Sequence, residues 1–139
     1  MMAQSNPSKT TAPKVISLSE DAGYFRAVFE SAAIGMALVG LDGKWLRVNP
    51  SLCDLLGRSE EELLALNFQR VTHPDDLAVD REVIHRLLEG AARSYTLEKR
   101  YLRKDGQVVW VLLAVALLHA PDGTPSQFIA QIQDISERK

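Results

Sequence analysis

Three histidines and one cysteine are the residues of this chain best suited to bind a metal or to act as a nucleophile. His73, His85 and His119 stand far apart and do not share the spacing of metal ligands. Cys53 stands in an apolar row and is interpreted as a small core residue. As the only cysteine, it can form no intramolecular disulfide. The sequence therefore predicts no metal site.

Serine catalysis and phosphate binding have no better support. Ser31, Ser51 and Ser94 stand in no recognisable nucleophile elbow, and the sequence places no histidine beside any of them. The glycines form no phosphate-binding loop. Glu98 and Arg100 alternate with apolar residues, which indicates a solvated or ion-paired strand face. We therefore predict a chain without catalysis of its own.

The composition is typical of one soluble globular domain. The 139 residues are 46% hydrophobic and 24% charged, and the net charge of −2 provides no basic footprint for nucleic acid and no polybasic membrane patch. No apolar run is long enough to span a membrane, and the N-terminus lacks the apolar segment of a signal peptide. A single cysteine agrees with a reducing environment, so a cytoplasmic location is expected.

The elements that must position these residues follow from apolar spacing, turns and caps. Residues 1–17, rich in Ser, Thr, Pro and Lys, predict a flexible tail, and residues 18–32 predict a flanking helix with one apolar stripe. The rest predicts an α+β fold, in which short helices cross one face of a five-stranded antiparallel sheet. The expected strands are Gly35–Val39, Trp45–Val48, Tyr95–Arg103, residues 107–118 and Phe128–Ile132, with helices after Asn49, after Ser59 and from Pro74 to Glu89.

The longest apolar run, residues 107–118, is predicted to be the middle strand of an antiparallel meander. It is rich in Val and is flanked by Asp105-Gly106 and Asp122-Gly123, which favour hairpin turns. Because it lacks polar alternation, both of its faces should be covered. The domain's helices can cover one face, and an N-terminal helix, a partner subunit or both can cover the other. The alternative is a fully buried strand of a sandwich.

Several short motifs stand in one order over residues 20–139. They are Tyr24 to Glu30, Gly43 to Pro50, Leu55-Leu56-Gly57 followed by Glu62-Leu63, His73 to Asp76, Arg103 to Gly106 with Trp110, and Asp134 to Arg138. In this order the motifs resemble the PAS sensor family in the sensory-box form of bacterial signalling proteins. The resemblance implies a sheet in the order second, first, fifth, fourth, third strand. It also implies a core over residues 33–135 and the start of a linker at residues 136–139.

The resemblance implies a sensory or interaction module of a signal-transduction protein. Effectors in this family are histidine kinases of two-component systems, or diguanylate cyclases and phosphodiesterases of cyclic-di-GMP signalling. A small apolar ligand inside the module, homodimerisation or both would regulate the effector. The alternative is a ligand-free dimerisation module with a packed interior. Nucleic acid is not an expected partner, and no membrane span is expected in this chain.

The residues do not favour the known cofactors of this family. A flavin photoadduct of the light-oxygen-voltage type needs a cysteine near Asn67-Phe68-Gln69, and none stands there. Haem sensors use a histidine on the long helix, where His85 lies, but the ligand position falls nearer Arg81. The identity of any ligand stays open.

Alternation along the strands, the helical period and the exit junction and dimer surfaces that the resemblance implies predict three groups of functional residues. The signal should leave through Asp134, Ile135 and Ser136. The dimer interface should comprise Tyr24, Phe25, Val28 and Phe29 with Val111, Leu113 and Val115. The candidates for the ligand pocket are Ala37, Val39, Asn49, Leu56, Phe68, Arg81, Ile84, His85, Leu87, Leu97, Trp110, Leu112, Ala130 and Ile132.

Overall fold

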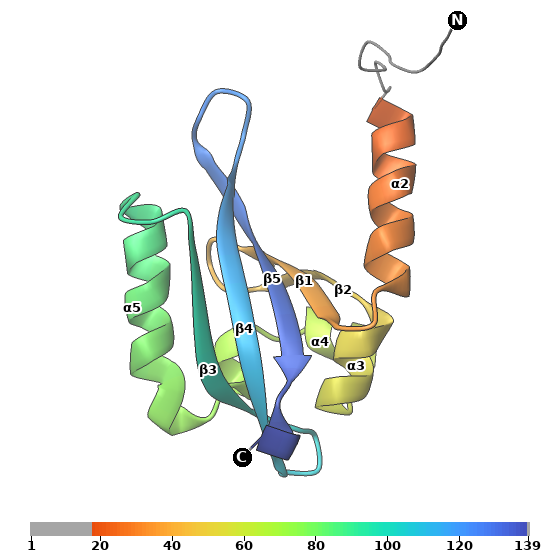
Figure 1. Ribbon diagram of the computed structural model, residues 1–139, viewed down its shortest axis with the longest axis vertical. Helices are drawn as coiled ribbons and strands as arrows, with labels where there is room; N and C mark the ends of the chain where they lie inside the picture. The colour runs from red at the N-terminus through yellow and green to blue at the C-terminus, as the bar shows by residue number, and fades with distance from the viewer. Residues whose placement is uncertain (1–17, 139) are drawn as a thin grey trace, which may run out of the picture.

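The structure, a computed structural model, describes residues 18–138 (Figure 1). The predicted tail, residues 1–17, lies outside the described residues, as does Lys139. Within the described part of the chain, no helix is long and apolar enough to cross a membrane.

Five antiparallel strands form one sheet in the order β2-β1-β5-β4-β3, which confirms the predicted α+β fold. The Asp-Gly turns predicted on either side of residues 107–118 are confirmed, and a third, Asp42-Gly43, lies between β1 and β2. Gly43, Gly106 and Gly123 have φ angles of 89°, 89° and 90°, a left-handed conformation that favours glycine. In each turn the aspartate side chain accepts a hydrogen bond from the amide two residues later. The strands are β1 (Gly35–Gly40), β2 (Trp45–Val48), β3 (Ser94–Leu102), β4 (Val108–His119) and β5 (Pro125–Asp134).

The shorter helices and α5 pack against the sheet, whereas α2 extends away from it (Figure 1). Two helix ends have the caps that their local sequence favours. Ser59 and Glu62 form a capping box on α4, and Gly57 ends α3 with a φ angle of 66°. The helices are α2 (Leu18–Ser31), α3 (Pro50–Leu56), α4 (Glu60–Leu64) and α5 (Leu77–Leu88), with 3₁₀ turns η2 (Phe68–Val71), η3 (Pro74–Asp76) and η4 (Ser136–Arg138).

Asn49 joins α2, β1 and α3 through a fully buried side chain. Its Oδ1 accepts hydrogen bonds from the amides of Met36 and Leu52, at 2.9 and 3.0 Å. Its Nδ2 donates to the carbonyl oxygens of Phe29 and Ile34, both at 3.0 Å. Asn49 therefore caps α3 and fixes the direction in which the chain enters the sheet.

The two faces of β4 are the reverse of those predicted. Val111, Leu113 and Val115 are buried in the core, whereas Trp110 and Leu112 lie half-buried on the opposite face. The reason is the register of the β3–β4 hairpin, in which Leu97 pairs with Leu113 and therefore shares its face. The outer face of β4 is thus formed by Val108, Trp110, Leu112, Ala114 and Ala116.

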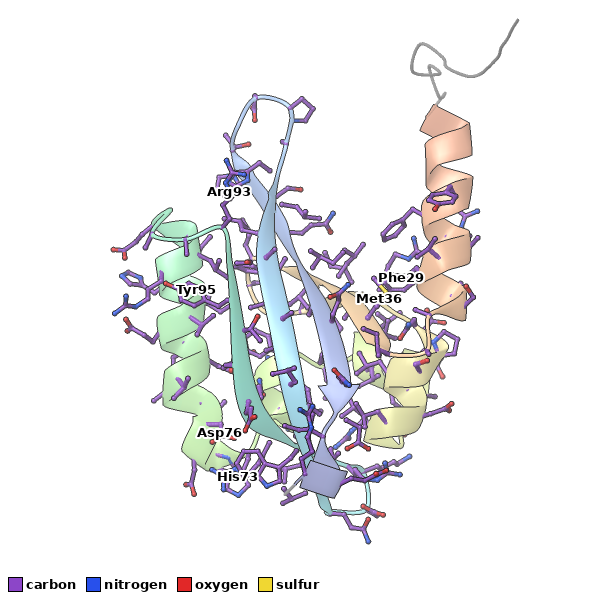
Figure 2. The ribbon with its side chains drawn as sticks, viewed as in Figure 1. Phe29, Met36, His73, Asp76, Arg93 and Tyr95 are labelled. Carbon is purple, nitrogen blue, oxygen red and sulfur yellow. The ribbon has the colours of Figure 1, made fainter. Side chains whose placement is uncertain are left out.

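Helix α2 is anchored near its C-terminal end. Phe29 is fully buried, and the Arg47 guanidinium lies 5.0 Å from the centre of its ring. Figure 2 shows Phe29 and Met36 in the region where α2 meets β1. Tyr24 and Val28 of the same helix are 75% and 43% exposed. Phe29 is therefore already covered within this chain, and only the earlier residues of the predicted interface present exposed surface.

Candidate functional site

A cavity of about 40 Å³ lies between α5 and the inner face of the sheet. A cavity needs roughly 10–15 Å³ to hold one water molecule, so this one can hold more than one. Apolar and aromatic side chains dominate the lining, and one acid and one amine are its charged members. The lining residues are Val39, Trp45, Phe68, Asp80, Val83, Ile84, Lys99, Tyr101, Leu113, Val115, Phe128 and Ala130.

The amine is Lys99, and the alternation of β3 directs it inward. Tyr95, Leu97, Lys99 and Tyr101 occupy one face of this strand, so a lysine joins an otherwise apolar row. The side chains of Lys99 and Asp80 are 2% and 4% exposed, and the two form an ion pair. Asp80 reaches Lys99 from α5, on the same stripe as Val83, Ile84 and Leu87.

Thr72 completes this buried polar group. The Lys99 ammonium donates a hydrogen bond to the Thr72 hydroxyl at 2.9 Å, and this hydroxyl lies 2.7 Å from the carbonyl oxygen of Phe68. The ammonium also lies 4.6 Å from the centre of the Tyr101 ring and 5.4 Å from that of Phe68. Burial lowers the pKa of Lys99, and the Asp80 carboxylate opposes part of this effect. Burial also raises the pKa of Tyr101.

Trp45 also lines the cavity and carries a buried polar atom. The residue is 1% exposed, and its indole Nε1 has no hydrogen-bond partner among the described residues. Buried indole N–H groups usually have a partner, so this atom is a second unusual feature of the site.

Four of the predicted pocket residues line the cavity: Val39, Phe68, Ile84 and Ala130. Ala37, Leu56, Leu87 and Ile132 belong to the core without lining it, and Leu97 packs against that core half-buried. Asn49 caps α3, as described above, and does not line the cavity. Four of the predicted pocket residues were wrong, because their side chains lie away from the cavity. Arg81 and His85 point to solvent on α5, with His85 Nε2 3.0 Å from Glu89 Oε2, and Trp110 and Leu112 lie on the outer face of the sheet.

Sequence reasoning missed the charged residues of the site. Neither Lys99 nor Asp80 is among the residues predicted from the sequence. A signal was present in the sequence. Lys99 has the same parity as Tyr95, Leu97 and Tyr101, which the apolar pattern of this strand assigns to the inner face.

A second ion pair joins the same two regions outside the cavity. Asp76 accepts hydrogen bonds from the Arg100 amide at 2.7 Å and from its guanidinium at 2.7 and 3.1 Å. The Arg100 hydrogen bonds hold the pKa of Asp76 below its usual range. The guanidinium lies 5.1 Å from the ring centre of Trp110. Figure 2 shows His73 and Asp76 at the foot of α5.

The predicted exit residues follow directly from β5. Ile135 is 2% exposed, and its amide donates to the Trp110 carbonyl oxygen at 2.9 Å. The Ser136 amide donates to Asp134 Oδ1 at 2.8 Å, where η4 begins. The end of β5 is therefore fixed to β4 before the chain leaves the domain.

The described residues contain no arranged metal-binding site and no arranged site for thiol chemistry. Where side chains are described, no group of three or more His, Cys, Asp or Glu residues is placed to hold a metal ion. Cys53 lies half-buried on α3, away from the cavity lining, and burial raises the pKa of its thiol.

Comparison with known proteins gives one family. The PAS fold model matches residues 23–135. Over 122 residues the chain is 51% identical to the probable diguanylate cyclase DgcE of Escherichia coli (strain K12). The matched segment covers 88% of this chain and 11% of that protein. Over 124 residues the chain is 28% identical to the sensor histidine kinase TmoS of Ectopseudomonas mendocina. This second matched segment covers 89% of this chain and 13% of that protein. The chain therefore spans only a small part of the length of these curated relatives.

A solved structure agrees with both the sequence match and the fold. A crystal structure of a domain of the sensory box sensor histidine kinase/response regulator from Geobacter sulfurreducens superposes with a TM-score of 0.72 at 26% identity. The match covers 85% of this chain and 97% of that chain.

Proposed function

This chain belongs to the PAS family of sensory modules, and we propose that the state of its interior cavity regulates an effector joined beyond Lys139. The observation that carries the proposal is the cavity between α5 and the sheet, which is apolar except for a few placed polar groups. Sites for small molecules in proteins have this character. The ligand would be small, because the cavity volume is about 40 Å³.

The path from the cavity to the effector is short. Phe128 and Ala130 of β5 line the cavity, and β5 ends at Asp134. Ile135 then fixes this end to the Trp110 carbonyl oxygen of β4. A ligand that repacks the inner face of β5 would therefore shift the exit at Ser136, and packed elements amplify small shifts because they have discrete arrangements.

The effector is proposed from the relatives. Two of the curated relatives described above are a probable diguanylate cyclase and a sensor histidine kinase. We propose that an attached enzyme of one of these two classes carries the catalysis and that this module only regulates it. A cytoplasmic location of the module stays a prediction.

A fusion experiment tests the sensory function without a known ligand. A diguanylate cyclase domain is joined after Lys139, and the cavity is filled by Ile84→Phe. Val79→Phe is the matched control, because Val79 lies on the same helix and is 52% exposed. Cyclase activity should change with Ile84→Phe and remain at the wild-type level with Val79→Phe. Equal activity of all three proteins would contradict regulation through the cavity.

The same fusion tests the geometry of the exit. One to seven residues are inserted between Lys139 and the cyclase domain, so that any continuing helix turns by about 100° per residue. Activity should rise and fall with the helical period. Activity that ignores the insertion length would contradict a helical lever, although not the sensory role.

A ligand-free dimerisation module is the second candidate, and exposed apolar surface favours it. On the outer face of the sheet, Val108 is 47% exposed beside the half-buried Trp110 and Leu112. On α2, Tyr24 and Val28 are 75% and 43% exposed. Surfaces of this kind mark interaction sites, and a second copy of the chain would bury both regions in a two-fold arrangement.

Sedimentation at tens of micromolar protein tests the dimer. Leu112→Glu places a charge on the outer face and should produce monomers. Leu41→Glu is the control, since Leu41 is 42% exposed just after β1 and outside the proposed interface. A wild-type monomer would contradict dimerisation. A bound mass in native mass spectrometry, or a visible chromophore, would favour the sensory candidate over the ligand-free one.

A further inference from the structure

We infer that the cavity takes a small uncharged molecule with one hydrogen-bond acceptor, to which the Trp45 indole N–H donates. This inference rests on the proposed sensory function and specifies the class of its ligand. It starts from the unpartnered Nε1 of Trp45, a residue that is 1% exposed and lines the cavity. A buried donor without a partner requires an explanation, and an acceptor atom inside the cavity supplies one.

The charges at the wall indicate that this acceptor belongs to a neutral molecule. Lys99 already pairs with Asp80 and donates to the Thr72 hydroxyl, so the polar group at the wall carries no net charge. A carboxylate in the cavity would lie near the Asp80 carboxylate, and its burial would lack a free counter-charge. An ammonium ligand offers only donors, so it could not accept from Trp45.

The size and lining of the cavity set the rest of the molecule. The volume of about 40 Å³ corresponds to about three positions of water size. The side chains of Val39, Ile84, Val115 and Phe128 offer only apolar surface there. A short-chain alcohol, aldehyde or ketone satisfies both requirements, because it joins one acceptor oxygen to a few carbon atoms.

The two tryptophans of the chain make the inference measurable. In a ¹H–¹⁵N spectrum each indole N–H gives one signal, and Trp110 on the outer face is a built-in control. The chain is titrated with 1-propanol, propionate and propylammonium, which share a three-carbon chain and differ in charge. We expect 1-propanol to shift the Trp45 signal with saturation. The Trp110 signal should stay in place, and the two ions should shift the Trp45 signal at least tenfold less at equal concentration.

Two variants connect any shift to the cavity. Ile84→Phe should abolish the 1-propanol shift, whereas Val79→Phe on the same helix should retain it. Trp45→Phe removes the donor and should weaken binding at least tenfold, followed on the methyl signal of Ala130. If Trp45→Phe does not fold, the pair of α5 variants still decides the result.

Three outcomes would overturn the inference. Stronger binding of propionate or propylammonium would contradict the ligand class, and the sensory function would stand. A 1-propanol shift that survives Ile84→Phe would place binding outside the cavity. No shift with any probe would mean that water alone satisfies Trp45. The sensory function itself fails only if the cyclase fusion ignores Ile84→Phe, so the two failures are distinguishable.

Discussion

Two ion pairs connect α5 and the turn before it to β3, and they lie on opposite faces of that strand. Asp80 and Lys99 pair inside, with side chains 4% and 2% exposed. Asp76 and Arg100 pair outside, with side chains 16% and 25% exposed. The two acids are one helical turn apart, and the two bases are consecutive on a strand whose side chains alternate. The same connection is therefore made once in the core and once at its rim.

The difference shows how burial changes the hydration of an ion pair and the energetic cost of breaking it. Outside, the Asp76 carboxylate retains access to water and gains an amide and a guanidinium as donors. Inside, Asp80 and Lys99 depend on each other and on Thr72. A buried pair is costly to break and yet adds little to stability compared with apolar residues of the same volume. Its presence beside the cavity is therefore better explained by the site than by stability.

The largest effect is expected when the inner pair loses one partner. Asp80→Ala leaves the Lys99 ammonium buried without a counter-charge, and we expect the free energy of unfolding to fall by about 3–5 kcal/mol. Urea denaturation followed by tryptophan fluorescence measures this loss. A fall of less than about 1 kcal/mol, the range of exposed pairs, would contradict the description of this pair as buried.

Replacing both partners separates the loss of the pair from the cost of an unpaired charge. In the double variant Asp80→Leu with Lys99→Met, no buried charge remains, so stability should be between unchanged and about 4 kcal/mol higher than in the wild type. The double-mutant cycle gives the interaction energy directly. A double variant as unstable as Asp80→Ala would mean that this region needs the polar group to fold.

A smaller effect is expected at a buried polar residue that carries no charge. Asn49→Ala removes the cap of α3 and leaves the Met36 amide and the Phe29 carbonyl oxygen without their side-chain partner. We expect a loss of about 2–3 kcal/mol in the free energy of unfolding. Asn67→Ala is the control, because Asn67 caps η2 at an exposed position and should cost about 1 kcal/mol or less. Equal losses would show that burial adds nothing to the cap.

Features marked by neighbouring residues could be predicted from the sequence, whereas features that depend on distant contacts could not. Strand order, turns and caps could be predicted, because Asp-Gly pairs, Ser59 with Glu62, and the PAS motifs mark them locally. The faces of β4 were predicted in reverse, because a run without polar residues gives alternation no marker. The register of the β3–β4 hairpin determines which face of β4 points inward. Gly106 closes a turn that pairs Tyr101 with Val109, so an inward Tyr101 requires an inward Val109.

The site was harder to predict than the fold, for a related reason. A lysine among charged neighbours, as in Glu98-Lys99-Arg100, indicates a solvated strand face. Its actual environment depends on Asp80 and Thr72, which are distant in sequence and come together only when α5 packs on β3. The unpartnered state of the Trp45 Nε1 atom could not be predicted, because no sequence pattern marks a missing hydrogen-bond partner.

The outer pair should make a modest contribution that depends on pH. Because the pKa of Asp76 is lower in the folded protein than in the unfolded chain, the unfolded state binds more protons as pH falls. The contribution of Asp76 is therefore present above the unfolded pKa, about 3.9, and is lost as pH falls through the folded value. Asp76→Asn should flatten this part of the curve of unfolding free energy against pH. At pH 7 its effect should be smaller than that of Asp80→Ala. An unchanged acid slope would contradict the role of Arg100.

The smallest effect is expected at a third ion pair, which completes the series from buried to exposed. Lys104 pairs with Glu62, and these side chains are 59% and 38% exposed. The pair holds the pKa of Glu62 below its usual value, but water screens such contacts and long side chains lose entropy when they are ordered. Lys104→Met should therefore leave the urea midpoint within measurement error, and about 1 M salt should remove any residual difference. Glu62→Ala should lower the midpoint more, because it also opens the capping box with Ser59. If Lys104→Met destabilised the protein as much as Asp76→Asn, burial would not be the variable that separates these pairs, and the explanation of the Asp80–Lys99 pair by its place beside the cavity would lose its basis.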